Sequence, residues 1–301
     1  YAVRELGLKP LVVCFDHGFY RDGVTNNRNR TFKELGVDSL LFTPNWKLVR
    51  EIMLTSLRDK GDFCWHCHTG VSSYPVIVAM EKGIPLIIWG ESSTEYTSYF
   101  SVNEFHDIDE SSYNRIANLS ISAEDMLLRI GGFFELRDLK PFMFPAKEEF
   151  RASGIKSFPL GNYIKWDTKE NVRRIKQELD WEGDSVEGVP PEYDYEKIEC
   201  MMQGVRDYLK FRKRGYARAT HLTAIDLRNS RISVETAKRM SVDFEALKPY
   251  SLPLFLQILE ISEDELNEII NEHIISPWDG SVPVKIGPKP HDYDTWVRKL
   301  L

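Results

Sequence analysis

The chain has 301 residues, of which 42% are apolar and 12% aromatic, enough to bury a core and to exclude a disordered chain. A net charge of −7 argues against a nucleic-acid-binding surface, which would need a basic face. Four cysteines are too few for a small disulfide-built domain, and no apolar run approaches the roughly 18 residues of a membrane span. We therefore expect a cytoplasmic protein that uses neither nucleic acid nor a membrane as its partner.

The first half of the sequence alternates short apolar runs with helical patterns. Strands are predicted at 11–16, 38–44 and 84–90, and helices at 25–36, 46–61 and 70–83. The run IPLIIWG (84–90) is apolar without alternation, as expected of a strand that is covered on both faces. Strands and helices that alternate at this spacing predict an α/β fold with a parallel sheet wound by helices.

The second half reads as mainly helical. Helices are predicted at 121–131 (with Ser122 as N-cap), 168–179, 205–215 and 252–261, a strand at 157–167 and an acidic loop at 181–199. A further helix follows the capping sequence that begins at Ser262, and its acidic residues argue against DNA binding. The tail at 276–296 is rich in proline and glycine and is expected to be extended. We predict two domains, an α/β domain at 1–180 and an α-helical C-terminal region at 181–301.

Two predicted strands end in residues suited to a nucleotide. Asp16, His17 and Gly18 follow the first strand, and GESSTE (90–95) follows the strand at 84–90. Open parallel sheets bind ligands beyond the carboxyl ends of their strands. Glycine permits close approach to a phosphate, and carboxylates hold Mg²⁺ through oxygen. The alternative for each segment is an ordinary polar loop.

Cys64 and Cys67 belong to CWHCH (64–68), which also matches the spacing of a covalent haem site. A cytoplasmic location argues against haem. A zinc or iron–sulfur site, a redox dithiol, and two structural thiols in a turn remain open. His66 and His68 offer nitrogen ligands, but a tetrahedral zinc site with this pair would need a further donor.

A cluster of charged residues lies between 205 and 233. The predicted helix at 205–215 is basic, which indicates either a solvated face or a phosphate-facing stripe. The candidate residues for a ligand that carries phosphates and hydroxyls are Tyr216, Arg218, His221, Asp226 and Arg228. Arginine pairs phosphate oxygens through two parallel hydrogen bonds, which suits a diphosphate. An ion-pair network among these residues is the alternative.

Four blocks together resemble the N-acetyl sugar amidotransferase family. They are FDHGFYRD (15–22), CWHCHTG (64–70), IPLIIWGESSTEY (84–96) and GYARATHLTAIDLRNSRIS (215–233), and the resemblance extends from residue 1 to about residue 270. The family belongs to the PP-loop ATP-pyrophosphatase superfamily, with an adenine nucleotide alpha hydrolase-like fold. Its members act in bacterial surface-polysaccharide (O-antigen, lipopolysaccharide) and nonulosonic-acid biosynthesis.

One motif of that family is missing from these residues. The SGGxDS phosphate loop should precede the first helix, and the chain opens inside that helix at YAVRELG. We expect that the sequence is shortened at its N-terminus, because a parallel sheet without a central strand would expose its edges. The alternative is a protein that has lost the ability to bind phosphate.

The resemblance implies an ATP-dependent amidotransferase that converts the N-acetyl group of a nucleotide sugar to an acetamidino group, releasing AMP and pyrophosphate. It implies ATP and Mg²⁺ as cofactors and a glutaminase subunit as the source of ammonia. Asp16, His17, Gly18, Gly90, Glu91 and Ser92 would bind the nucleotide, and Glu91 and Glu95 would act catalytically near Mg²⁺.

Two other functions remain as alternatives. One is a tRNA sulfur-transfer enzyme of the same superfamily, whose C-x-x-C pair binds a cluster or metal with a third cysteine. The acidic balance of the chain argues against it. The other is a non-catalytic subunit that binds a glutaminase or a sugar.

Overall fold

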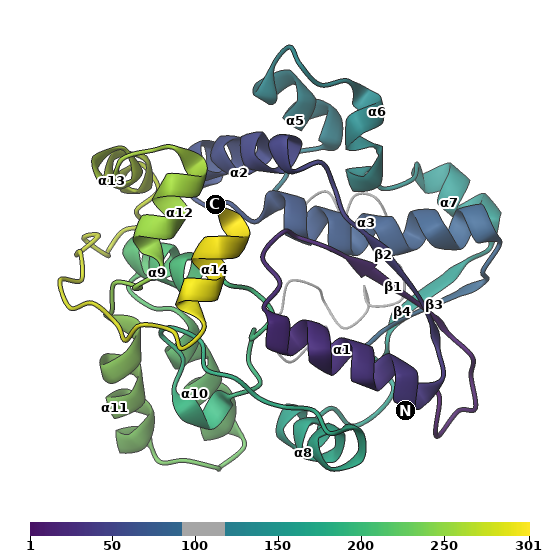
Figure 1. Cartoon of the computed structure of the whole chain (residues 1–301). Helices are drawn as coiled ribbons and strands as arrows, with labels where there is room; N and C mark the ends of the chain where they lie inside the picture. The colour runs from purple at the N-terminus through teal and green to yellow at the C-terminus, as the bar shows by residue number, and fades with distance from the viewer. Residues whose placement is uncertain (92–117) are drawn as a thin grey trace. The chain divides into compact units, whose positions relative to one another are not determined.

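The computed structural model describes residues 1–91 and 118–301 (Figure 1). The strands are β1 (Leu11–Phe15), β2 (Asp38–Phe42), β3 (Leu86–Trp89) and β4 (Lys156–Pro159). The helices are α1 (Asp22–Leu35), α2 (Trp46–Lys60), α3 (Trp65–Lys82), α5 (Ala123–Ile130), α6 (Leu136–Leu139), α7 (Lys147–Ser153), α8 (Thr168–Leu179), α9 (Gln203–Arg214), α10 (Arg218–Arg228), α11 (Val234–Glu245), α12 (Leu252–Leu259), α13 (Glu263–Asn271) and α14 (Tyr293–Leu300). The mixed α/β class is confirmed.

The chain forms two compact units. Unit 1 comprises Tyr1–Gly18, Arg28–Thr55 and Cys64–Trp181, and unit 2 comprises Phe19–Asn27, Ser56–Phe63 and Glu182–Leu301. Unit 1 holds all four strands, and unit 2 holds the helices from α9 onward. The main boundary between the two units lies between Trp181 and Glu182. Unit 2 also includes two short segments from the first third of the chain.

The strands of unit 1 pair two by two. β1 runs parallel to β2, from Leu11 opposite Asp38 to Phe15 opposite Phe42, and α1 connects them. β3 runs parallel to β4, from Leu86 opposite Lys156 to Trp89 opposite Pro159. In residues 1–91 and 118–301 the parallel pairing that we expected is therefore present, but as two two-stranded sheets and not as one wound sheet.

Helix α3 packs against both β1 and β3. A glycine makes the first contact possible, because a Cβ at Gly70 would overlap the ring of Phe15. Around this contact lies an apolar core, to which α2, α5 and the segment after α6 also contribute. Its buried members are Phe15, Leu48, Ile52, Trp65, Ile121, Ala123, Met126, Leu139 and Phe142.

Local signals placed many helix ends correctly. Ser122 caps α5 by accepting the backbone N–H of Asp125, and Ser262 caps α13 by accepting that of Glu265. The segment predicted as a loop at 181–199 has one 3-10 turn, at Pro191–Tyr193. The strand predicted at 157–167 is shorter, since β4 ends at Pro159.

The end of the chain differs from the sequence-based expectation. The tail was expected to be extended, but α14 begins at Tyr293 and buries Trp296. An acidic residue in its first turn and basic residues in its last turn favour this helix. The proline and glycine residues before it masked that short pattern. Among the described helices, none has the length and apolar character that crossing a bilayer would require.

Candidate functional site

The turn after β1 is closed by the carboxylate of Asp16. Its Oδ1 accepts the backbone N–H of Gly18 at 2.8 Å, and its Oδ2 accepts the hydroxyl of Thr43 at 3.3 Å. Gly18 has φ +86°, and a Cβ there would overlap the ring of Trp46. The Asp-His-Gly sequence therefore forms a tight turn that joins the carboxyl ends of β1 and β2.

His17 and His66 connect this turn to α3. The side chain of His17 is buried, and its backbone carbonyl lies 3.1 Å from Nε2 of His66, which is itself 1% exposed. A carbonyl oxygen only accepts hydrogen bonds, so Nε2 of His66 carries the proton. The beginning of α3 is thereby held against the turn at the end of β1.

Cys64 and Cys67 lie at the beginning of α3. The helix predicted at 70–83 begins earlier than expected, because α3 starts at Trp65, with Cys64 at the N-cap position and Cys67 in the first helical turn. Cys64 is buried, Cys67 is half-buried, and neither forms a disulfide. In the described part of the chain, no group of three or more close His, Cys, Asp or Glu ligand atoms includes either thiol. A metal at this pair stays a prediction.

Gly90 and Glu91 follow β3, as the sequence predicts. Both residues are exposed, and the carbonyl of Glu91 accepts the backbone N–H of Gly161 at 2.9 Å, beyond the end of β4. Ser92 and Glu95, the other residues predicted at this strand end, lie outside the described residues. Two predicted nucleotide-binding segments thus lie at the carboxyl ends of β1 and β3, the two strands that α3 contacts.

The predicted sugar-binding residues of unit 2 separate into two groups. Arg218 is buried and makes ion pairs to Glu196 at 2.9 Å and to Asp207 at 3.3 Å. Asp226 is also buried, accepting the hydroxyl of Tyr193 at 2.8 Å and pairing with Arg231 at 3.3 Å. The ion-pair alternative therefore describes both residues.

The other three predicted residues are at least partly accessible to solvent. Tyr216 and Arg228 are exposed, and His221 is half-buried. Burial, together with the positive charges of Arg218, Lys210 and Arg228, lowers the pKa of His221 to about 4. His221 is consequently neutral at physiological pH.

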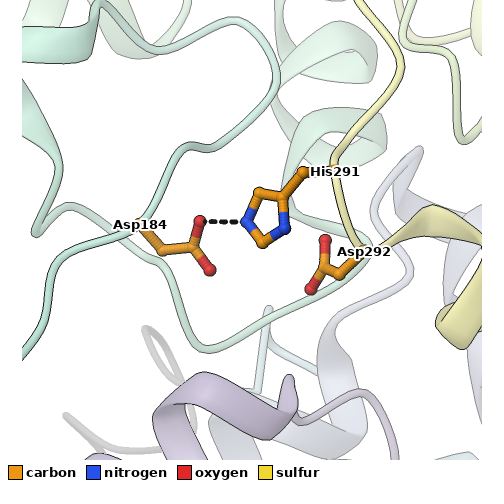
Figure 2. Close-up of side chains that lie close together, drawn as sticks. All are labelled: Asp184, His291 and Asp292. Carbon is orange, nitrogen blue, oxygen red and sulfur yellow. Dashed lines mark hydrogen bonds and ion pairs between the residues drawn. The ribbon is translucent and has the colours of Figure 1, made fainter.

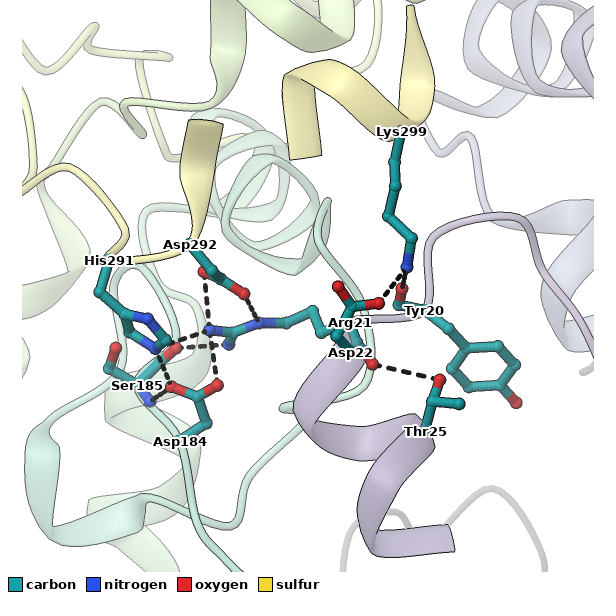
Figure 3. Close-up of polar contacts among 9 residues, drawn as sticks. All are labelled: Tyr20, Arg21, Asp22, Thr25, Asp184, Ser185, His291, Asp292 and Lys299. Carbon is teal, nitrogen blue, oxygen red and sulfur yellow. Dashed lines mark hydrogen bonds and ion pairs between the residues drawn. The ribbon is translucent and has the colours of Figure 1, made fainter. Parts of the chain in front are cut away.

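A second cluster, which no sequence motif indicated, is centred on Arg21. Its guanidinium lies 2.7 Å from Asp184, donates to both carboxylate oxygens of Asp292 at 3.0 Å, and donates to the carbonyl of Ser185 at 2.7 Å (Figure 3). Burial by itself would raise the pKa of Asp292, but the N–H groups of Arg21 and Trp296 and the charges of Arg21 and His291 together lower that pKa. No local pattern could reveal the cluster, because its members come from three separate segments.

His291 completes a group of three potential metal ligands. Its Nε2 lies 2.7 Å from Oδ1 of Asp184, and Asp292 is its neighbour in the chain (Figure 2). The ligand atoms of Asp184, His291 and Asp292 lie within 4.8 Å of one another. A cation there would meet the buried guanidinium of Arg21, which already makes ion pairs with both carboxylates. The group is better described as an ion-pair network than as a metal site.

A pocket of about 330 Å³ adjoins this network within unit 2. Its lining combines carboxylates with a few apolar side chains. The lining residues are Asp22, Gly23, Val24, Asn27, Glu182, Gly183, Asp184, Ile198, Met201, His291, Asp292, Thr295 and Trp296. Lys299 balances part of the negative charge, since its Nζ donates to Asp22 at 2.5 Å (Figure 3).

Comparison with known proteins adds no assignment. No protein-family model matches the chain, and no curated protein matches it either.

Proposed function

We propose that this chain carries the nucleotide- and sugar-binding parts of an ATP-dependent amidotransferase of the PP-loop type, which converts the N-acetyl group of a nucleotide sugar to an acetamidino group. The observation that carries the proposal is the pairing of the strands. β1 pairs with β2 and β3 pairs with β4, all in parallel, and α3 contacts both β1 and β3.

Among residues 1–91 and 118–301, this pairing fits four strands of a five-stranded doubly wound sheet. Such sheets have the order 3-2-1-4-5, so that strand 1 lies between strands 2 and 4. If β1, β2, β3 and β4 take places 2, 3, 4 and 5, the open place lies between β1 and β3. A strand followed by a phosphate loop would fill it.

The positions of two polar residues support a ligand site in such a sheet. A doubly wound sheet places the ligand at the point where the strand order reverses, beyond the carboxyl ends of the strands. Asp16 and Glu91 follow the two strands that would flank this point. The exposed carboxylate of Glu91 is a suitable oxygen ligand for Mg²⁺, and the closed Asp16 turn presents a rigid edge to the nucleoside.

The carbonyl carbon of an amide is a weak electrophile, so the acetamido group must be activated before ammonia can attack it. The acetamido oxygen attacks the α-phosphate of ATP, forming an O–P bond as the bond to pyrophosphate breaks. Ammonia then attacks the activated carbon and, after it loses a proton, AMP leaves with the oxygen. Because free ammonia is scarce at neutral pH, we propose a glutaminase as the partner that supplies it.

The products into which ATP is cleaved during the reaction test the proposal. The full-length protein, given ATP, Mg²⁺, ammonia and an N-acetylated nucleotide sugar, should form AMP and pyrophosphate in proportion to amidino product. Formation of ADP and phosphate would overturn it.

A matched pair of variants tests the role of Glu91. Glu91→Gln should lower turnover at limiting Mg²⁺ at least tenfold, since a neutral amide is a weaker Mg²⁺ ligand. Glu81→Gln changes an exposed glutamate near the end of α3 and should leave the rate at the parent value. Equal rates for both variants would remove Glu91 from the site.

A further inference from the structure

The pocket of about 330 Å³ lies wholly within unit 2 and has the size of a small-molecule site. Four segments that are distant in the sequence meet in it: the start of α1, the loop at 182–184, the segment at 198–201 and the segment at 291–296. Part of its wall is apolar. The apolar side chains are Val24, Ile198, Met201 and Trp296. Such a wall suits a ligand with a carbon skeleton.

The charged side chains in the wall of the pocket are acidic, apart from the ionisable His291. They are Asp22, Glu182, Asp184 and Asp292, and among the described residues no lysine or arginine lines the pocket. Arg21 pairs with Asp184 and Asp292, and Lys299 pairs with Asp22 (Figure 3). These three carboxylates therefore carry one more charge than their two cationic partners while His291 is neutral. An anion would be repelled from the pocket and a cation attracted.

The paired carboxylates can still accept hydrogen bonds from a ligand. Arg21 is 1% exposed, but the side chains of Asp184 and Asp292 keep 18% and 21% of their surface exposed. Asp292 accepts two hydrogen bonds from Arg21, whereas a carboxylate offers about four lone-pair positions. The side chain of Asp22 is more open, at 60% exposed. Acceptors thus remain for the N–H or O–H groups of an occupant.

Trp296 adds a hydrogen-bond donor that the protein itself does not satisfy. The residue lines the pocket and is 3% exposed, and its indole N–H makes no hydrogen bond within the described structure. A buried donor without an acceptor costs free energy, and a buried tryptophan N–H usually finds a partner. A ligand oxygen in the pocket would supply the acceptor. The occupant should therefore carry hydroxyl or carbonyl groups, which a bare metal ion lacks.

We propose that this pocket binds a sugar-sized organic cation, whose charged group contacts the carboxylates and whose hydroxyl groups reach the N–H of Trp296. An amidinium group is suited to it, because its parallel N–H groups match the two oxygens of a carboxylate. The acetamidino sugar formed in the proposed reaction is a cation of this kind. Assigning the pocket to that sugar rests on the proposed function, whereas the preference for a cation does not.

Two sugars that differ in one group test the site. 2-Acetamidino-2-deoxyglucose carries the amidinium, and N-acetylglucosamine carries the neutral amide of the same shape. Each is titrated into the ¹⁵N-labelled full chain while the indole N–H resonance of Trp296, assigned with Trp296→Phe, is followed. The amidino sugar should shift this resonance and bind about tenfold more tightly, because hydrogen bonds to charged groups are stronger. Equal affinity for the two sugars, or a Trp296 resonance that does not move, would overturn the proposal.

Matched aspartate variants separate the pocket from general charge. Asp22→Asn removes a carboxylate from the wall and should weaken binding of the amidino sugar about tenfold. Asp294→Asn removes an exposed carboxylate of α14 that does not line the pocket and that also pairs with a lysine, Lys289, so affinity should stay within twofold. Equal losses in both variants, or none in Asp22→Asn, would overturn the site. Urea titration checks that both variants fold as the parent does.

The outcome is distinguishable from that of the proposed function. Selective binding of the amidino sugar that depends on Asp22, in protein that forms no AMP, would support the pocket and reject the amidotransferase. AMP formation by protein that binds the two sugars equally would reject the pocket and support the amidotransferase.

Discussion

The guanidinium of Arg21 lies 2.7 Å from a carboxylate oxygen of Asp184, although the two residues are far apart in the sequence. Arg21 is 1% exposed, and its guanidinium also lies 5.3 Å from the centre of the Trp296 ring. Hydrogen bonds to Ser185 and Asp292 complete its surroundings (Figure 3). One side chain therefore ties the start of α1, the loop at 182–185 and the start of α14 together within unit 2.

Replacing Arg21 should destabilise the protein strongly. Arg21→Met keeps much of the apolar volume but leaves two carboxylates without their cation, at a cost of about 3–5 kcal/mol in the free energy of unfolding. Arg58→Gln is the control, because Arg58 forms a solvent-exposed pair with Glu265 and should contribute about 0–1 kcal/mol. Urea denaturation measures both. Similar losses for the two variants would contradict the role of Arg21.

Arg218→Lys should act on stability more than on sugar binding. Lysine retains the charge but cannot contact Glu196 and Asp207 through a planar fork, so we expect a loss of about 1–3 kcal/mol in unfolding free energy. If the variant had the stability of the parent and selectively weakened sugar binding, this prediction would be contradicted and Arg218 would be assigned to the proposed sugar site.

Gly70→Ala should be destabilising although alanine favours helices. The new Cβ would overlap the ring of Phe15 at the contact between α3 and β1, which costs about 1–3 kcal/mol and exceeds the gain of about 1 kcal/mol in helix propensity. Gly132→Ala is the control, since a Cβ there meets nothing within 4 Å. Thermal unfolding at matched pH compares them, and a stabilised Gly70→Ala variant would show that α3 approaches β1 less closely.

His221 should make the protein sensitive to acid. Its folded-state pKa of about 4 lies below the ordinary value of 6.5, so the unfolded chain binds the proton first and stability is lost as pH falls from 6.5 to 4. Because the ring is only half-buried, solvent screening reduces this contribution to about 1–2 kcal/mol.

His221→Gln cannot take up that proton. Its unfolding free energy should fall less than that of the parent between pH 7 and pH 4.5. The comparison of the two chains by urea titration cancels the contribution of the carboxylates, which both share. Identical pH dependence in the two proteins would show that His221 titrates normally.

The sequence by itself determined the local elements of this protein. Apolar runs bounded by breakers located β1, β2 and β3, and helical periodicity located α1, α2, α8 and α9 close to their observed ends. Helix N-caps such as Ser122 could also be predicted from the sequence. The capping side chain and the backbone N–H that it accepts lie within one helical turn, so the signal is local. Where the local signal was weak, as in α14, the expectation was wrong.

Only the tertiary structure decided which distant groups meet. Arg218 and Arg228 look alike in the sequence, yet the first is enclosed by two carboxylates and the second is exposed. Asp184 belongs to a loop that reads as a solvated acidic surface, and the fold brings Arg21 to it. The physical reason is that charge partners and strand neighbours are selected by packing between remote segments, whose geometry no short stretch of sequence contains.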